Sequence, residues 1–264
     1  MATRALFTKE LEAALLEGKA DFAVHSLKDL PTDLPAGLKL SAVAGEREDV
    51  RDVLIYRIGN GLVPKMTLKD FPPGLTVATG SARRQTQLLA ARPDFKTMPI
   101  RGNVPTRLHK LLEQPHMDAT ILAAAGLSRL GMRITPTGHL RAEGIAGELG
   151  VFVFEPEVML PCVGQGAIGL EIRENDERTA EICRKLDHLD TFQCVVAERA
   201  FLATMGGGCQ TPIGAYASLS GNQIHLRAVA HLTENVQRGE ARAPRAQAVA
   251  LGQKVAAVVL GQGK

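Results

Sequence analysis

The sequence predicts an α/β fold with mixed, largely parallel sheets, followed by a small α+β domain. Up to about residue 130, short apolar segments alternate with segments whose apolar residues recur at helical spacing, a pattern typical of parallel sheets. From about residue 190, a helical segment precedes alternating strands and a closing helix. A chain of 264 residues with 45% hydrophobic content can bury the cores of two or three domains.

The first half of the chain contains the predicted alternation of strands and helices. Apolar residues at helical spacing predict a helix over residues 6–16, and residues 21–26 form a short apolar strand that leads to Pro31, which cannot continue a strand or helix. Further strands are expected at 38–44, 52–56, 75–79, 96–100 and 118–124, and further helices at 82–91, 104–112 and 125–130.

The second half is less regular. Residues 135–157 are rich in glycine and indicate an insertion or a connection between lobes. The last part predicts a helix at 195–202, strands at 215–219 and 224–230, and a closing helix at 247–260. Residues 18–24 and 115–121 each place an aspartate before an apolar strand, a short match that hints at two similar lobes.

Composition excludes some classes of protein. The net charge of +3, from 31 basic and 28 acidic side chains, is too small to indicate a nucleic-acid-binding protein. The four cysteines, Cys162, Cys183, Cys194 and Cys209, form no C-x-x-C pair, so we expect neither a metal site nor disulfides. No signal-peptide or membrane-spanning pattern is present. We therefore expect a cytoplasmic protein without nucleic-acid or membrane partners.

The segment from Met205 to Gly214, MGGGCQTPIG, places Cys209 directly after three glycines and shortly before Pro212. Glycine lets other groups approach the backbone closely, and an accessible thiol can carry covalent chemistry. An isolated G-G-G-C segment is also compatible with a surface turn that happens to contain a cysteine.

Two arginine-bearing segments follow neighbouring strands. Ser81 is expected to cap a helix whose first turn holds Arg83 and Arg84, where the helix dipole disfavours positive charge by roughly 0.3–1 kcal/mol each. A bound anion would offset that cost, although two solvated surface arginines remain the alternative. The second segment supplies Arg101 and Arg107. Ligands of open α/β sheets bind beyond the carboxyl ends of strands, and guanidinium groups suit carboxylates or phosphates.

Two further loops carry candidate residues. Lys28 and Asp29 follow the strand at 21–26. They are either a solvated pair or, in a cationic cleft, a place where an ionised aspartate stabilises positive charge. His25 is interpreted as a packed strand residue rather than a base. The two glycines around Gln165 allow a tight crossing between lobes, or a turn between strands.

These segments together resemble the porphobilinogen deaminase family. The resemblance rests on AVHSLKDLP at 23–31, TGSARRQ at 79–85, RGNV at 101–104, VGQG at 163–166 and GGCQTPIG at 207–214, which occur in the order found in the family. It implies two lobes like those of periplasmic binding proteins and a C-terminal domain with the cofactor cysteine. We place the first lobe at 1–48 with 160–188, the second at 49–159 and the C-terminal domain at 189–264.

The resemblance also implies the chemistry. The family joins four porphobilinogen molecules head to tail into hydroxymethylbilane and releases ammonia. Cys209 would hold a dipyrromethane cofactor through a thioether bond, and Asp29 would be the catalytic carboxylate that stabilises a cationic azafulvene. The residues implied to line the cofactor are Ser26, Lys28, Thr79, Gly80, Ser81, Arg83, Arg84, Arg101 and Gly102, and those implied to bind substrate are Lys9, in a mobile loop region, Arg107 and Gln165.

The resemblance further implies several dozen residues before Leu6, including a first strand and a helix with another substrate-binding arginine. We therefore expect a chain truncated at its N-terminus, with an exposed sheet edge in the first lobe. Whether Arg133 supplies a further substrate arginine is left open. The expected protein is a monomeric transferase of tetrapyrrole and heme synthesis. The alternative is an inactive fragment or a non-catalytic two-lobe protein that binds small carboxylated ligands.

Overall fold

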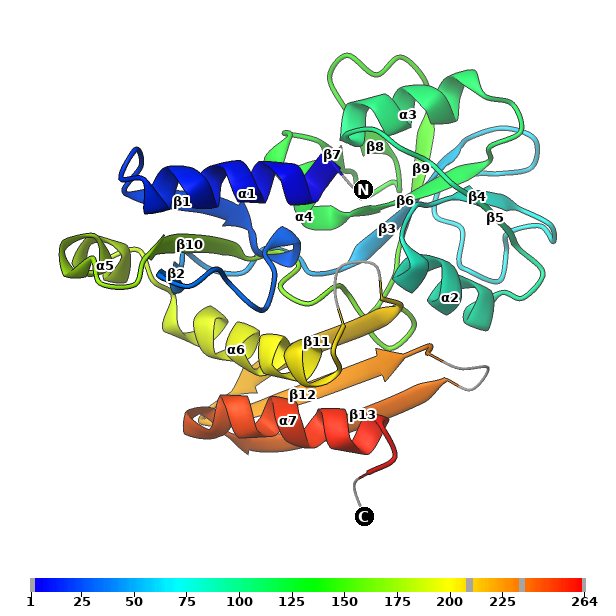
Figure 1. Ribbon diagram of the computed structural model, residues 1–264. Helices are drawn as coiled ribbons and strands as arrows, with labels where there is room; N and C mark the ends of the chain where they lie inside the picture. The colour runs from blue at the N-terminus through cyan, green and yellow to red at the C-terminus, as the bar shows by residue number, and fades with distance from the viewer. Residues whose placement is uncertain (1–2, 208–210, 233–235, 263–264) are drawn as a thin grey trace. The chain divides into compact units, whose positions relative to one another are not determined.

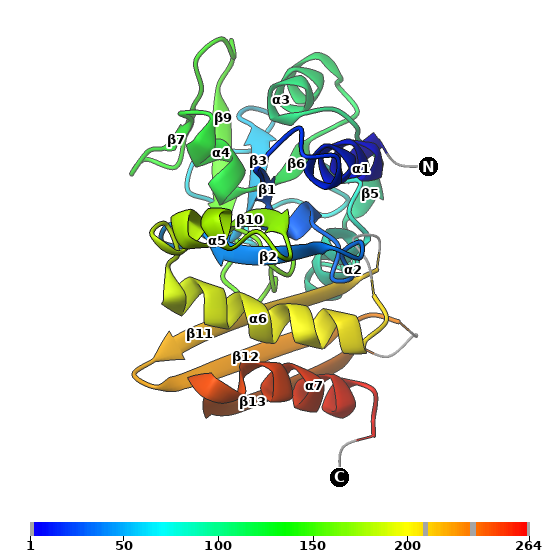
Figure 2. The same ribbon diagram turned by 60° about the vertical axis from the view of Figure 1, so that its left-hand side comes forward.

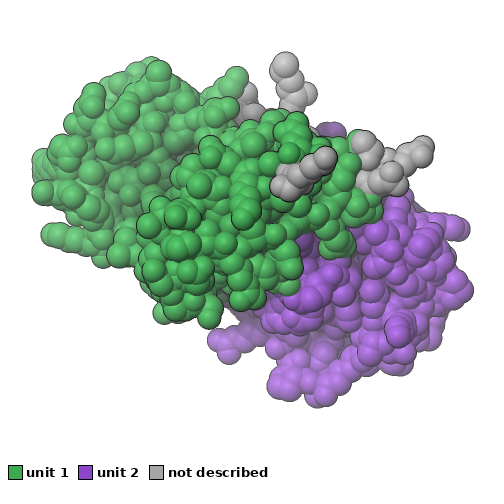
Figure 3. All heavy atoms as spheres, turned by 90° about the horizontal axis from the view of Figure 1, so that it is seen from below, with its two compact units in different colours: residues 1–48, 162–264 green, residues 49–161 purple. Residues whose placement is uncertain are grey.

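The computed structural model describes residues 3–207, 211–232 and 236–262. The chain divides into two compact units, shown in different colours in Figure 3. The first unit comprises residues 1–48 and 162–264, and the second unit comprises residues 49–161. The separation of the first unit into a lobe and a C-terminal domain with the boundaries given above stays a prediction.

The lobe of the first unit is a three-stranded antiparallel sheet of order β1-β10-β2 (Figure 1). Leu15 of the first helix packs with Ala23 on one face of this sheet, and Cys183 of another helix packs with Leu170 on the other face. The elements are α1 (Thr3–Leu16), β1 (Phe22–Ser26), β2 (Leu38–Val43), β10 (Ile168–Arg173) and α5 (Glu177–Arg184). The helix and the two strands expected before residue 48 are confirmed, whereas β10 and α5 were not predicted.

The second unit is a five-stranded mixed sheet of order β5-β4-β6-β3-β9. The parallel pairs are confined to β5-β4-β6, and β3 runs antiparallel to both of its neighbours. Leu88 of α2 packs in the core on one face, and Leu108 of α3 and Leu127 of α4 pack on the other. The elements are β3 (Asp52–Arg57), β4 (Thr76–Ala78), α2 (Ala82–Ala91), β5 (Lys96–Met98), α3 (Val104–Glu113), β6 (Ala119–Ala123), α4 (Ala124–Arg129), β7 (Arg133–Ile134), β8 (Leu140–Arg141) and β9 (Leu149–Val153).

The prediction that residues 135–157 are irregular was wrong for part of the segment, because β9 lies there and pairs with β3. A Cβ atom on Gly150 would lie 2.3 Å from a ring carbon of the buried Tyr56. The glycine therefore marks a strand that packs closely against an aromatic ring, one of the known meanings of glycine within a strand.

The C-terminal domain is a three-stranded antiparallel sheet of order β11-β12-β13 with two helices on one face (Figure 2). Phe201 and Val255, from the two helices, are fully buried in its core. The elements are α6 (Leu189–Thr204), β11 (Ile213–Ser220), β12 (Gln223–Ala230), β13 (Gln237–Pro244) and α7 (Ala248–Val259). β13 was not predicted, because charged residues and glycine make up half of the strand. No helix in the described ranges is long and apolar enough to cross a membrane.

Candidate active site

The two arginine-bearing segments lie side by side in the second unit. Their strands, β4 and β5, are parallel neighbours, so both segments leave the same edge of the sheet. The backbone N–H of Thr79 donates to the carbonyl oxygen of Met98 at 2.8 Å. A Cβ atom on Gly80 would lie 3.0 Å from the carbonyl oxygen of Ile100. The strand ends therefore approach closely, as the sequence predicted.

Each segment continues into a capped helix. The Ser81 side chain accepts a hydrogen bond from the Arg84 backbone N–H at the start of α2, and Asn103 accepts one from Thr106 at the start of α3. Gly102 has a φ of +121°, and a Cβ atom there would lie 2.7 Å from the Thr106 side chain. Glycine is therefore required at this turn, and the first backbone N–H groups of two helices lie at one sheet edge, where they favour anions.

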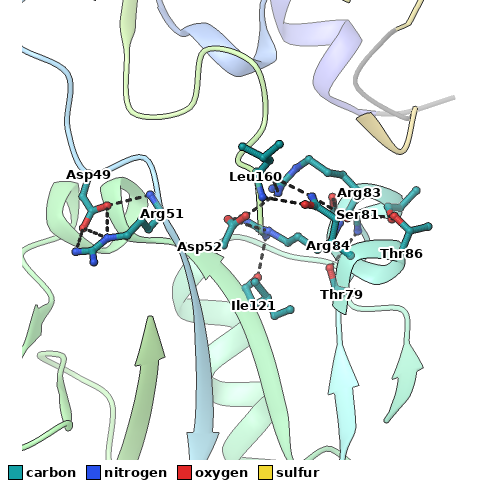
Figure 4. Close-up of polar contacts among 12 residues, drawn as sticks. Asp49, Arg51, Asp52, Thr79, Ser81, Arg83, Arg84, Thr86, Ile121 and Leu160 are labelled. Carbon is teal, nitrogen blue, oxygen red and sulfur yellow. Dashed lines mark hydrogen bonds and ion pairs between the residues drawn. The ribbon is translucent and has the colours of Figure 1, made fainter. Parts of the chain in front are cut away.

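Arg83 and Arg84 are buried and share one carboxylate (Figure 4). Arg83 Nη1 lies 2.8 Å from Asp52 Oδ2 and donates to the carbonyl oxygen of Leu160 at 2.7 Å. Arg84 Nη2 and Nε donate to Asp52 Oδ1 at 2.7 and 3.1 Å, and its Nη1 donates to the carbonyl oxygen of Ile121. The alternative of two solvated surface arginines is therefore wrong.

Asp52 was missed as a site residue. Burial alone would raise the pKa of Asp52, but the charges of Arg83 and Arg84 outweigh it and hold that pKa well below its usual range. This carboxylate supplies within the chain much of the compensation that the sequence analysis had assigned to a bound anion. One carboxylate against two guanidinium groups still leaves one positive charge. The signal in the sequence was an aspartate that opens an otherwise apolar strand.

The second segment keeps a cation at the surface. Arg101 is exposed, and its carbonyl oxygen accepts a hydrogen bond from Lys110 Nζ at 3.0 Å. Arg107 is half-buried, and its Nε donates to the carbonyl oxygen of Gly102 at 2.8 Å. These bonds hold the backbone of the loop, so the exposed Arg101 side chain extends from a fixed point.

In the first unit, the segment with Asp29 packs against the loop with Gln165. Residues Leu27–Asp29 form a single 3-10 turn directly after β1. A Cβ atom on Gly164 (φ +71°) would lie 3.2 Å from the Lys28 backbone nitrogen, and Leu27 N–H donates to the carbonyl oxygen of Ala167 at 3.0 Å. Ser26, Lys28 and Asp29 are half-buried, whereas Gln165 is buried. Residues 163–166 form a turn that leads into β10.

A second buried ion pair fixes this turn to the C-terminal domain. Arg47 donates to the Glu198 carboxylate through Nη1 at 2.6 Å and Nη2 at 3.0 Å, and its Nε donates to the carbonyl oxygen of Gln165. The backbone N–H groups of Gly164 and Ala217 also donate to Glu198, each at 2.8 Å. Sequence analysis missed both residues. The signal for Glu198 was an acidic residue inside an apolar helix.

The remaining predicted residues are placed less completely. Lys9 is exposed in α1 rather than in a loop. Cys209 lies outside the described residues. Burial raises the pKa of Cys194 to about 11 and also raises the pKa of Cys183, while Cys162 is partly exposed. Among the described residues, no group of three or more His, Cys, Asp or Glu side chains could hold a metal ion.

Comparison with known families decides the identity. Residues 1–181 match the "Porphobilinogen deaminase, dipyromethane cofactor binding domain", and residues 192–261 match the "Porphobilinogen deaminase, C-terminal domain". The chain belongs to the porphobilinogen deaminase family. It is therefore a hydroxymethylbilane synthase by family, a transferase of tetrapyrrole synthesis with a domain for the dipyrromethane cofactor.

Solved structures are also similar to this chain. The periplasmic VFT2 domain of BvgS from Bordetella pertussis is 15% identical, with a TM-score of 0.38 over 73% of this chain and 72% of that chain. An ABC transporter from Parabacteroides distasonis is 10% identical, with a TM-score of 0.40 over 74% of this chain and 60% of that chain. Both TM-scores are too low to support a conclusion, so the family assignment depends on the domain matches alone.

Proposed function

We propose that this protein joins four porphobilinogen molecules head to tail into hydroxymethylbilane and releases ammonia at each addition, primed by a dipyrromethane group on Cys209. The observation that carries the proposal is the match of both family domains, in order, along the chain. We further propose that it works as a cytoplasmic monomer.

The described cysteines support Cys209 as the attachment point. A thioether bond forms from a reactive thiolate, and a raised pKa keeps a cysteine in the thiol form at neutral pH. Cys183 and Cys194 are buried with raised pKa values. Cys162 is the partly exposed alternative, so it is the control for any experiment on Cys209.

The edge formed by β4 and β5 fits a ligand that carries carboxylates. The cluster of Arg83, Arg84 and Asp52 has one excess positive charge beside two helix N-termini, and Arg101 adds an exposed guanidinium group. In this proposal the arginines and the backbone of residues 79–81 hold acetate and propionate side chains of the pyrroles. When bound, the dipyrromethane supplies the pyrrole acceptor to which the first substrate is joined.

Asp29 has the proposed catalytic role. Loss of ammonia from porphobilinogen leaves positive charge on the substrate, and an ionised carboxylate placed nearby stabilises that charge. The backbone of Asp29 lies in the 3-10 turn, which the hydrogen bond from Leu27 N–H to the carbonyl oxygen of Ala167 ties to the start of β10, and this supports the proposed role. Lys28, the neighbouring cation, would bind a carboxylate of the same substrate. Convergence of Asp29 and the arginines on one ligand stays a prediction.

The test is the intact mass of the purified protein together with turnover of porphobilinogen. We expect the wild-type protein to carry the added mass of one dipyrromethane and to release ammonia from porphobilinogen. Cys209→Ser should show the bare polypeptide mass and no turnover, whereas Cys162→Ser should keep both properties. Asp29→Ala should keep its fold and lose turnover.

Two outcomes would overturn the proposal. A wild-type protein with the bare polypeptide mass that binds porphobilinogen without consuming it would be a non-catalytic binder. Normal turnover in the Asp29→Ala protein would remove Asp29 from the proposed role, even if the mass of the cofactor were present.

A further inference from the structure

A cluster of buried ionisable side chains lies beneath α1 in the first unit, outside the residues assigned above. It consists of His25 in β1, Glu171 in β10 and Glu12 in α1, with exposed fractions of 7%, 0% and 8%. His25 Nε2 lies 2.8 Å from Glu171 Oε2. Three such groups at one buried place are unusual, because charged groups are seldom buried without a specific reason.

The His25–Glu171 pair joins β1 to β10 at a cost in folding free energy. The other carboxylate oxygen, Glu171 Oε1, is buried and has no hydrogen-bond partner within the described ranges. A buried, half-satisfied carboxylate destabilises a protein relative to well-packed apolar residues of similar volume. Apolar residues of similar volume would therefore join the two strands at least as well as this pair does.

Within the described residues, Glu12 of α1 interacts electrostatically with both members of the pair, and Lys9 interacts with Glu12. Burial raises the pKa of Glu12, and the negative charge of Glu171 raises it further, against the opposite influence of His25 and Lys9. On the sheet, Glu171 lies opposite Ala23 and Leu40, and His25 lies opposite Gly169.

Arg173, the next residue of β10 on the face of Glu171, does not supply a second partner. Its Nη1 donates to the carbonyl oxygens of Leu15 and Ala20. Its Nη2 donates to the carboxylates of Asp21 and Asp176. The guanidinium group therefore serves the end of the sheet where α1 and β1 are joined, and the Glu171 side chain is bonded to His25.

His25 lies just before the turn that carries Asp29, so the pair affects where that turn lies. His25 is the residue before Ser26, and β1 passes directly into the Leu27–Asp29 turn without an intervening loop. Any slip of β1 along β10 would displace this turn. The pair fixes His25 of β1 to β10 just before the turn, and the hydrogen bond from Leu27 to Ala167 fixes the turn itself.

We propose that His25 and Glu171 are positioning residues for the segment Ser26–Asp29, and that they act by fixing the alignment of β1 on β10. The proposal rests on the catalytic role proposed for Asp29. Neither side chain needs to contact substrate. Their effect on turnover would come from the placement of the Asp29 carboxylate, for which an error of about 1 Å can cost on the order of 100-fold in rate.

The test compares His25→Gln and Glu171→Gln with the wild-type protein. Glu171→Gln keeps the shape of the side chain and removes its charge. If His25→Gln does not fold, Glu171→Gln still tests whether the pair positions the segment Ser26–Asp29. The control is His225→Gln, which removes the histidine of an exposed pair with Glu240 in the C-terminal domain. For each protein we would measure the intact mass, hydrogen exchange without substrate, and kcat and KM for porphobilinogen.

We expect the two variants to keep the cofactor mass, to lose between about 10- and 100-fold in kcat, and to change KM little. Amide exchange should accelerate in residues 22–30 and stay unchanged in the C-terminal domain, and the control should match wild type. An unchanged kcat in a folded variant, or faster exchange throughout the first unit, would overturn the proposal. If the wild-type protein has no turnover, the proposed function fails, and the exchange measurement still decides whether the pair holds the segment.

Discussion

Replacing Asp52 by Asn tests how the second unit tolerates two buried arginines. Asp52 is fully buried at the start of β3, and its two carboxylate oxygens contact both Arg83 and Arg84. Asparagine has nearly the same shape but no charge. The substitution therefore removes the counter-charge of both guanidinium groups and leaves the packing volume almost unchanged.

The expected loss is large because both arginines stay where they are. Breaking a buried ion pair by removing one partner costs about 3–5 kcal/mol, since an uncompensated charge remains in the interior. Losing an ordinary neutral hydrogen bond costs only about 1 kcal/mol. We expect the free energy of unfolding of Asp52→Asn to fall by about 3–5 kcal/mol at pH 7. A loss of this size would show that the charge of Asp52 matters, and not only its hydrogen bonds.

The pH dependence has a definite sign. The folded pKa of Asp52 is lowered, so its stabilising contribution is complete above the unfolded pKa of about 4. It is lost as the pH falls below that value toward the folded pKa. The difference between wild type and Asp52→Asn should therefore be constant between about pH 5 and pH 7 and should shrink below about pH 4.

Urea unfolding monitored by circular dichroism measures these differences. The matched control is Asp49→Asn, three residues earlier, because Asp49 pairs with Arg51 at the surface, where the two side chains are 38% and 35% exposed. An exposed pair contributes about 0–1 kcal/mol. Equal losses in the two variants, or a difference that grows below pH 4, would refute the reasoning.

Three further predictions follow from the packing and the thiols. Gly150→Ala should destabilise the second unit by about 1–3 kcal/mol, measured by urea unfolding, because the new methyl group would overlap the Tyr56 ring. Glu198→Gln should cost about 3–5 kcal/mol in the same assay, because the buried Arg47 would lose its counter-charge. Iodoacetamide at pH 8 should alkylate Cys162 before Cys194, as mass spectrometry of peptides can show, because burial raises the pKa of Cys194 to about 11.

For each of these predictions, one result would contradict it. For the glycine, Gly126→Ala in α4 is the control, since the nearest atom to its added methyl group is 4.0 Å away, and it should be neutral or slightly stabilising. A similar loss at both glycines would contradict the packing argument. Wild-type stability of Glu198→Gln would contradict the prediction for the buried ion pair. Faster alkylation of Cys194 than of Cys162 would contradict the prediction for the thiols.

The sequence predicted features that depend on neighbours along the chain. The α2 helix begins at Ala82, as expected, because Ser81 caps it locally. The side-by-side placement of the two arginine segments also followed from the rule that parallel strands end at one edge. These parts of the candidate site could be predicted because short-range patterns determine them.

The missed features depend on partners far away in the chain. Asp52 meets Arg83 and Arg84 across about thirty residues, and Arg47 meets Glu198 across 151 residues. No local pattern reports such a pairing. The strand β10 was missed because its partners, β1 and β2, precede it by more than a hundred residues.

The place of β10 in its sheet has a consequence for biosynthesis. Residues 168–173 form the central strand, flanked by two strands that leave the ribosome far earlier. Residues 49–161 are synthesised in between as one continuous stretch, so they can fold first, as domains generally do during translation. Until β10 emerges, β1 and β2 lack the strand that pairs with both of them, so this sheet can be completed only after the whole second unit has been synthesised.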